Sequence, residues 1–81
     1  MVLNVTQRNV LRALAENKNK WMSVEEIYKC CLKTKHKVNR SNIIRSINFF
    51  VEHKLITEPN SVGKVKITKG GVDIFTEDVL K

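Results

Sequence analysis

Apolar and polar positions separate most clearly between Arg40 and Lys54, where their spacing predicts an amphipathic α-helix. At about 100° per residue, one side of this helix gathers apolar side chains, those of Ile43, Ile44, Ile47, Phe50 and Val51. The opposite side is formed by Ser41, Arg45, Asn48, Phe49 and Glu52. Because any surface helix shows such a two-sided pattern, the helix alone does not decide between a solvated face and a binding face.

Capping signals predict three further helices. Asn4 with Gln7, and Ser23 with Glu26, have the spacing of capping boxes, and Thr68 is placed to cap a last helix. The first of these helices is expected over residues 5–17. Asn39 or Ser41 can cap the helix that begins at Arg40. The residues expected to face inward are Val10, Leu11 and Leu14 in the first helix, Val24, Ile27, Tyr28 and Cys31 in the second, and Val72, Phe75 and Val79 in the last.

A β-hairpin is predicted before the last helix. Residues 55–58 are a short β-prone run, residues 59–63 contain turn-forming types, and residues 64–68 alternate between polar and apolar. Val65 and Ile67 then share one face, and Lys64 and Lys66 share the other. These lysines either contact a partner or keep an exposed edge from aggregating, and the two roles are compatible. Upstream, residues 21–22 form either a one-ladder strand or an apolar anchor for the second helix.

Length and charge narrow the class of protein. With 81 residues, the chain is predicted to be one domain, residues 1–81, near the size at which a partner subunit is often needed for stability. The formal net charge is +7, and the positive charges are unevenly placed. Residues 27–51 and 59–72 contain lysine and arginine but no acidic residue. This polarity predicts one basic face, which suits a nucleic-acid partner.

Several functional classes are not expected. The chain has no apolar run of about 18 residues and no signal-peptide order, which predicts a soluble cytoplasmic protein without a membrane partner. Cys30 and Cys31 are adjacent and, with only His36 and His53 elsewhere, offer no zinc motif, so neither metal nor another cofactor is predicted. No nucleophile–base pair or acid pair indicates an enzyme. Cys31 is expected in the core, whereas Cys30 is either a half-exposed thiol or an intersubunit disulfide.

The order of the predicted elements resembles a winged helix-turn-helix domain, an α+β fold with a three-helix core, a two-stranded β-hairpin wing and a C-terminal helix. The segment VEHKLIT at 51–57 resembles the family's exit from the recognition helix into the wing. The segment VKITKGGV at 65–72 resembles its second wing strand and the start of its last helix. The chain is most similar in character to MarR-like regulators and to small winged-helix proteins of archaea and archaeal viruses, many of which are basic and dimeric. Lys54 departs from the pattern, because the family usually has glycine there.

Together these features predict a sequence-specific double-stranded DNA-binding protein, a transcriptional regulator that acts as a homodimer with residues 40–54 in a major groove. The expected base-reading residues are Ser41, Asn42, Arg45, Ser46, Asn48 and Phe49. The expected phosphate contacts are Lys33, Lys35, Lys37 and Arg40, with Lys64 and Lys66 from the wing. The candidates for a dimer contact are Leu3, Val5, Cys30, Ile74 and Leu80, which lie at or beyond the edge of the predicted apolar stripes.

Two questions stay open at this level. Phe49 lies opposite the apolar stripe, where it can meet a thymine methyl group, pack under the wing or contact a second subunit. The alternative function is a winged-helix protein–protein interaction module of a transcription or replication assembly. Nothing in the sequence marks a pocket for a small-molecule effector.

Overall fold

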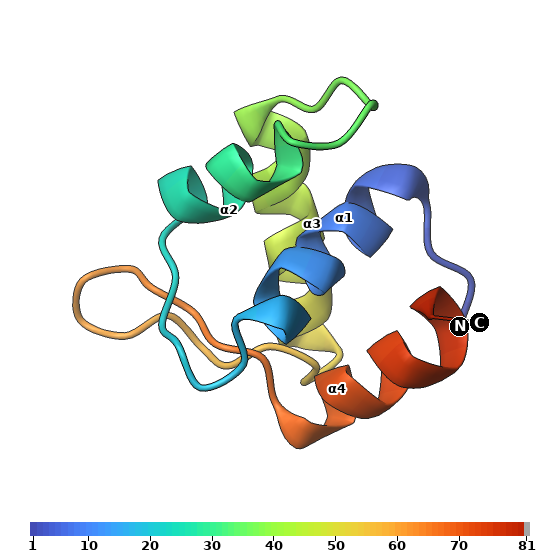
Figure 1. The fold of residues 1–81 in the computed structure, drawn as a ribbon. Helices are drawn as coiled ribbons and strands as arrows, with labels where there is room; N and C mark the ends of the chain where they lie inside the picture. Colours follow the sequence, from blue (N-terminus) through green and yellow to red (C-terminus); the bar gives the residue numbers. More distant parts are fainter. Residues whose placement is uncertain (81) are drawn as a thin grey trace.

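Helices dominate the computed structural model, which describes residues 1–80. The elements follow the order α1 (Val5–Glu16), α2 (Val24–Cys31), α3 (Arg40–Glu52), α4 (Lys69–Ile74) and the π-helical turn η1 (Phe75–Val79). In Figure 1, α1 crosses in front of α3, with α2 and the C-terminal helices on opposite sides of that pair. Helices α1, α2 and α3 all contact one another, and η1 packs against α1. This arrangement leaves one side of α3 uncovered.

Local hydrogen bonds fix where each helix begins. The Asn4 side chain accepts from the Gln7 amide at 2.8 Å, and the Gln7 side chain accepts from the Asn4 amide at 2.9 Å. Ser23 and Glu26 form the same reciprocal pair at 3.2 and 3.1 Å, so both predicted capping boxes are confirmed. The predicted caps of the other helices are also present: Asn39 accepts from the Asn42 amide at 2.8 Å, and Thr68 accepts from the Gly71 amide at 3.1 Å.

One core lies between the helices, and the predicted inward residues of α1 form its centre. Val10, Leu11 and Leu14 are fully buried against Ile27 and Phe50. The predicted stripe of α3 needs one correction, because Ile44 is 44% exposed while its neighbour Ile43 is fully buried. The buried side of α3 is centred on Ile43, Ile47 and Phe50, and Ile44 lies about 100° away from Ile43.

The predicted two-stranded wing is reduced to isolated bridges. Within residues 1–80, antiparallel bridges join Ile56 to Ile67 and Met22 to Val65, without longer strands. The Thr57 amide donates to the Lys66 carbonyl at 2.8 Å, but the Lys66 amide donates to the Thr57 hydroxyl at 3.0 Å. This side-chain acceptor interrupts the ladder, and nearby Pro59 has no N–H to extend it. Met22 thereby pairs with the edge of the wing. This agrees with the first of the two predictions for residues 21–22, a one-ladder strand.

The end of α3 also differs from the expectation. The helix stops at Glu52, and Lys54 takes a left-handed conformation with φ of 61°. Glycine is the residue that adopts this conformation most readily, which accounts for its usual presence there in the family that the sequence resembles. None of the helices within residues 1–80 combines the length and the hydrophobicity needed to cross a membrane.

Candidate nucleic-acid interface

The uncovered side of α3 carries a short set of exposed side chains. Ser41, Arg45 and Asn48 lie on it together with Ile44 and Glu52. Among residues 1–80, the Arg45 guanidinium takes part in no hydrogen bond or ion pair. A guanidinium without a partner is the group that binds guanine or phosphate most directly, since its donors do not first have to be released.

Ser46 is not placed as predicted. Its side chain is 4% exposed, and its hydroxyl donates to the Asn42 carbonyl one turn earlier at 2.9 Å. The residue lies on the side of α3 that faces α1. The buried side of α3 therefore includes a polar residue as well as the apolar ones. Ser46 therefore helps to seat α3 and does not present its hydroxyl to a base.

The N-terminal end of α1 borders the same surface. A shallow hollow of about 240 Å³ lies between the two helices, lined by Asn4, Thr6, Gln7, Asn42, Arg45 and Ser46. Asn4 and Gln7 are held by their capping box, which leaves Thr6 as the side chain of α1 able to bond a ligand here. No sequence pattern predicts this contribution, because these residues precede α3 by more than 30 positions and meet it only through the packing of α1 on α3.

Arg40 is already engaged by α2. Its Nε and Nη2 atoms donate to the two carboxylate oxygens of Glu25, the Nη2 contact at 3.0 Å, and its guanidinium lies 4.2 Å from the centre of the Tyr28 ring. The hydrogen bond from Arg40 is the main cause that lowers the pKa of Glu25. The predicted phosphate contact of Arg40 stays a prediction, and a phosphate there has to compete with the carboxylate that holds this guanidinium.

The lysines predicted to contact phosphate differ in their surroundings. Lys35 and Lys37 are exposed in the loop before α3, and Lys33 borders a hollow near Cys30. In the wing, Lys64 lies 3.7 Å from a Glu26 oxygen, and the Lys66 ammonium lies 5.3 Å from the centre of the Trp21 ring. Glu26 also pairs with Lys20 at 3.4 Å, and the Ser23 backbone hydrogen bond is the main cause of its lowered pKa. The loop lysines are thus freer than those of the wing.

Phe49 packs within its own helix. The ring is half-buried, meets Phe50 edge-on with centroids 5.5 Å apart, and lies 4.3 Å from the centre of the His53 ring. His53 is held over it by a 2.9 Å hydrogen bond between Nδ1 and the Phe49 carbonyl. The ring covers the core beside Phe50. Contact of Phe49 with a thymine methyl group, with the wing or with a second subunit stays a prediction.

The predicted dimer candidates divide into two groups. Leu3, Cys30 and Ile74 are half-buried and pack against the core of the same chain. This packing accounts for their apolar character without a second subunit. Val5 and Leu80 remain exposed. Both cysteines are free thiols, and burial raises the pKa of Cys31 to about 11.

Comparison with known proteins gives the family. The model of the ferric uptake regulator family matches residues 3–69. The chain belongs to this family. Its members are DNA-binding regulators and not enzymes. A solved structure of the ferric uptake regulator from Francisella tularensis with iron is similar in fold, with a TM-score of 0.73 at 14% sequence identity. No curated protein sequence matches the chain.

The solved regulator is longer than this chain. The match covers 86% of this chain and 55% of the Francisella protein, so the chain spans about half the length of that relative. The likeness shows that the chain has the winged-helix fold.

The family name and the iron in the solved relative raise the question of a metal site. Within residues 1–80, no three side chains of His, Cys, Asp or Glu gather closely enough to hold a metal ion. Cys31 is a poor ligand, since burial keeps its thiol protonated and a metal binds the thiolate. The residues of this family member that the structure describes therefore do not fit a metal site.

Proposed function

We propose that this chain binds double-stranded DNA sequence-specifically as a homodimer and regulates transcription, with α3 in a major groove. The observation that carries this proposal is Arg45 on the uncovered side of α3, whose guanidinium has no partner within residues 1–80. The major groove admits one α-helix, and bidentate bonds from arginine to guanine are its commonest specific contact. The site of action is the cytoplasm, at the chromosome.

Other residues have separate roles in this proposal. Asn48 and Asn42 pair with adenine edges, and Ser41 and Thr6 bond nearby bases or phosphates. The exposed methyl groups of Ile44 face a thymine methyl group. Lys33, Lys35 and Lys37 neutralise phosphates beside the N-terminal end of α3, and Lys64 and Lys66 do so from the wing. The likeness to MarR-like and archaeal winged-helix proteins stays a prediction.

The proposal is tested by binding to duplexes selected from a random pool, measured by fluorescence anisotropy at several salt concentrations. Arg45→Ala is expected to cost about 1–3 kcal/mol of binding free energy and to relax preference at one base pair. Lys18→Ala is the matched control, since it removes one exposed positive charge from the turn after α1. A palindromic consensus would support the dimer.

The decisive comparison is between selected and random duplexes. If Arg45→Ala weakens both equally, the residue contributes charge but does not read a base. If Arg45→Ala and Lys18→Ala leave binding to both duplexes unchanged, α3 is not the DNA-binding helix.

A second candidate function is a protein–protein interaction module. The observation that favours it is Ile44, which is 44% exposed at the centre of a surface that otherwise suits polar contacts. Large exposed apolar groups often mark protein interfaces. A mobility shift with random duplex at low salt separates the two candidates, because a DNA-binding surface of this charge binds weakly without its specific site. No shift at low salt would favour the interaction module.

A further inference from the structure

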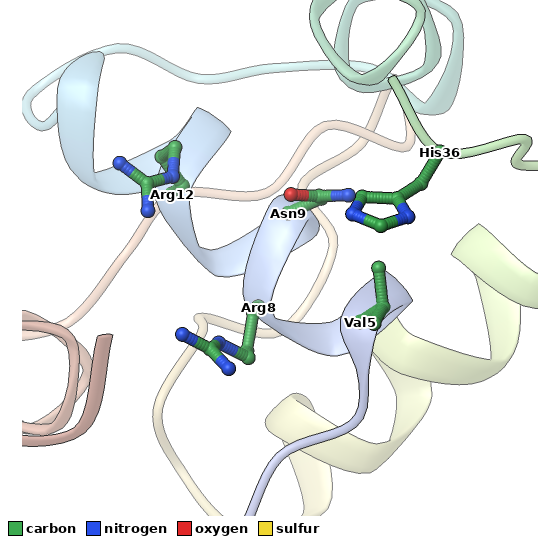
Figure 2. Close-up of a pocket in the computed structure, with 5 residues that line it drawn as sticks. All are labelled: Val5, Arg8, Asn9, Arg12 and His36. Carbon is green, nitrogen blue, oxygen red and sulfur yellow. The ribbon is translucent and has the colours of Figure 1, made fainter. Parts of the chain in front are cut away.

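A second hollow lies on the outer face of α1, away from the side that packs on the core. It has a volume of about 230 Å³ and is lined by Val5, Arg8, Asn9 and Arg12 of α1 and by His36 of the α2–α3 loop. In Figure 2, the Asn9 side chain extends toward the His36 ring, whereas the Arg8 and Arg12 side chains, one turn of α1 apart, extend away from that ring. Residues distant in sequence thus form one surface feature.

The polar groups of this hollow are rich in donors. None of the five lining residues is acidic, and within residues 1–80 neither Arg8 nor Arg12 has a carboxylate within 4.0 Å. Their guanidinium groups are four positions apart on one helix, where like charges repel. The Asn9 Nδ2 atom is shielded from solvent and has no hydrogen-bond partner in the described chain. A shielded donor without a partner carries a free-energy cost that an acceptor would remove.

The position of Arg12 is partly fixed in advance. Its guanidinium carbon lies 5.9 Å from the centre of the Phe75 ring of η1, within the range of a cation–π contact. This contact satisfies the face of the guanidinium group but leaves its N–H donors available at the edge. The Arg12 side chain, which lines the hollow, is therefore held against η1.

We propose that this hollow binds a phosphate-type oxyanion. Two guanidinium groups and one amide line it, and the planar donors of a guanidinium match the oxygens of a phosphate. The volume suffices for such an ion with part of its hydration, since one water occupies about 30 Å³ of liquid. Inorganic phosphate, a phosphomonoester and a backbone phosphate of a nucleic acid share this chemistry.

This site is separate from the proposed base-reading surface. Arg8 and Arg12 lie on α1 opposite its buried residues Val10, Leu11 and Leu14, and those buried residues face the core that α1 shares with α3. The uncovered side of α3 points away from that core. A duplex along α3 therefore contacts this hollow only if its backbone also passes the α2–α3 loop, which carries Lys35 and Lys37.

The test titrates the full chain, labelled with ¹⁵N, with inorganic phosphate while sodium chloride keeps the ionic strength constant. The expected result is saturable shifts of the Asn9 side-chain amide and of His36. Arg8→Gln should weaken phosphate binding roughly tenfold or more, because it removes a charged donor. Lys18→Gln removes an equal charge from a residue outside the hollow and should leave phosphate binding unchanged.

Asn9→Asp separates binding from folding. The new carboxylate lies in a hollow that two guanidinium groups also line, so the protein should stay folded and its melting temperature should not fall, whereas phosphate binding should be abolished by repulsion. A merely structural role of Asn9 would not produce this combination. Arg12→Gln is not used for this comparison, because it also removes the contact with Phe75 and can therefore unfold the protein.

A second arm identifies the source of the phosphate. Duplex binding by Arg8→Gln and Lys18→Gln is compared at several salt concentrations. The salt slope is the change of the logarithm of the binding constant with the logarithm of the salt concentration. A slope that is lower by about one unit for Arg8→Gln alone would place a backbone phosphate in the hollow. Saturable binding of inorganic phosphate that Arg8→Gln weakens would instead assign a free oxyanion. The proposal is overturned if phosphate leaves Asn9 and His36 unshifted and both variants bind duplex equally.

Discussion

Lys54 and Asn19 are the two residues other than glycine that have a left-handed backbone within residues 1–80, with φ of 61° and 76°. Asparagine tolerates this conformation, whereas the Cβ of lysine approaches the following carbonyl oxygen at a cost of about 1–2 kcal/mol. The sequence identified Lys54 as a departure from the family pattern, and the structure gives the physical reason. The chain keeps the turn that glycine normally makes and accepts the strain.

Lys54→Gly should therefore stabilise the fold by about 0.5 kcal/mol, because relief of backbone strain exceeds the extra entropy of glycine in the unfolded chain. Urea unfolding measures this change. Lys18→Gly is the control, since Lys18 lies in a turn without a left-handed backbone and should lose stability. If both substitutions destabilise equally, the conformation of Lys54 carries no strain.

Individual side chains of α3 show where periodicity is and is not sufficient. The helix cap at Asn39 follows from a local hydrogen bond, and local rules predicted it. Ser46 was expected to be exposed but is buried, and Ile44 was expected to be buried but is exposed. The reason is that burial on α3 depends on where α1 and α2 lie. A helical wheel gives the relative angles of side chains but not the direction from which a neighbouring helix covers them.

Among the elements, the junction of the wing and α4 depends on one glycine. A Cβ at Gly71 would lie against the Leu55 carbonyl oxygen and 2.6 Å from Ile67 Cγ1, whereas a Cβ at Gly70 would meet nothing closer than 3.6 Å. Gly71→Ala should destabilise the protein by about 1–3 kcal/mol through overpacking. Gly70→Ala should be neutral or stabilising by about 0.4–1 kcal/mol, because alanine restricts the unfolded chain.

Thermal and urea unfolding of the two variants give a matched comparison within one helix turn. Equal effects of Gly70→Ala and Gly71→Ala would show that α4 does not pack closely on residues 55 and 67. The sequence predicted the cap at Thr68 but not this contact, since the wing and α4 approach each other only in the folded chain.

The ion pair between α2 and α3 controls how much charge the interface offers. Glu25 holds Arg40, and the pKa of Glu25 is lowered. Its carboxylate therefore stays charged at pH values below the ordinary pKa of a glutamate. The ion pair opens only when the pH falls below the lowered pKa. Glu25→Gln should free Arg40 for a phosphate. Duplex binding should then tighten at low salt, and the salt slope should increase by about one unit.

Glu77→Gln is the matched control for this prediction, because it removes the same charge from an exposed position on η1. Anisotropy titrations with random duplex at several salt concentrations measure both variants. An equal increase for Glu25→Gln and Glu77→Gln would mean that only net charge matters and that Glu25 does not restrain Arg40.

At the scale of the molecule, the order of helices and the placement of basic residues predicted the winged-helix fold, which the family and structural matches support. The length of the wing strands was overestimated. The alternation of side chains does not reveal that the Thr57 hydroxyl, instead of a backbone carbonyl, accepts the hydrogen bond from the Lys66 amide. The hollow at Arg8 and Arg12 could not be predicted either, since it needs His36 to return beside α1. Helix caps, which depend on one segment, were predictable, whereas the wing ladder and this hollow, which depend on two segments, were not.

The proposed homodimer needs an apolar surface through which the two subunits contact each other. Figure 1 places the two ends of the described chain side by side, and the Met1 amino group lies 3.3 Å from an Asp78 carboxylate oxygen. Val2 and Leu80 there are 99% and 60% exposed. Leu80→Glu places a charge on this surface and should raise the dimer dissociation constant at least about tenfold.

Sedimentation velocity over a range of protein concentrations measures that constant. Val62→Glu is the control, because Val62 is 71% exposed at the tip of the wing, far along the chain from either end. Leu80→Glu should also weaken binding to a palindromic site more than to a half-site, since only the full site gains from joining two subunits. A wild-type chain that stays monomeric at all concentrations, or equal behaviour of the two variants, would remove this end of the molecule as the dimer contact.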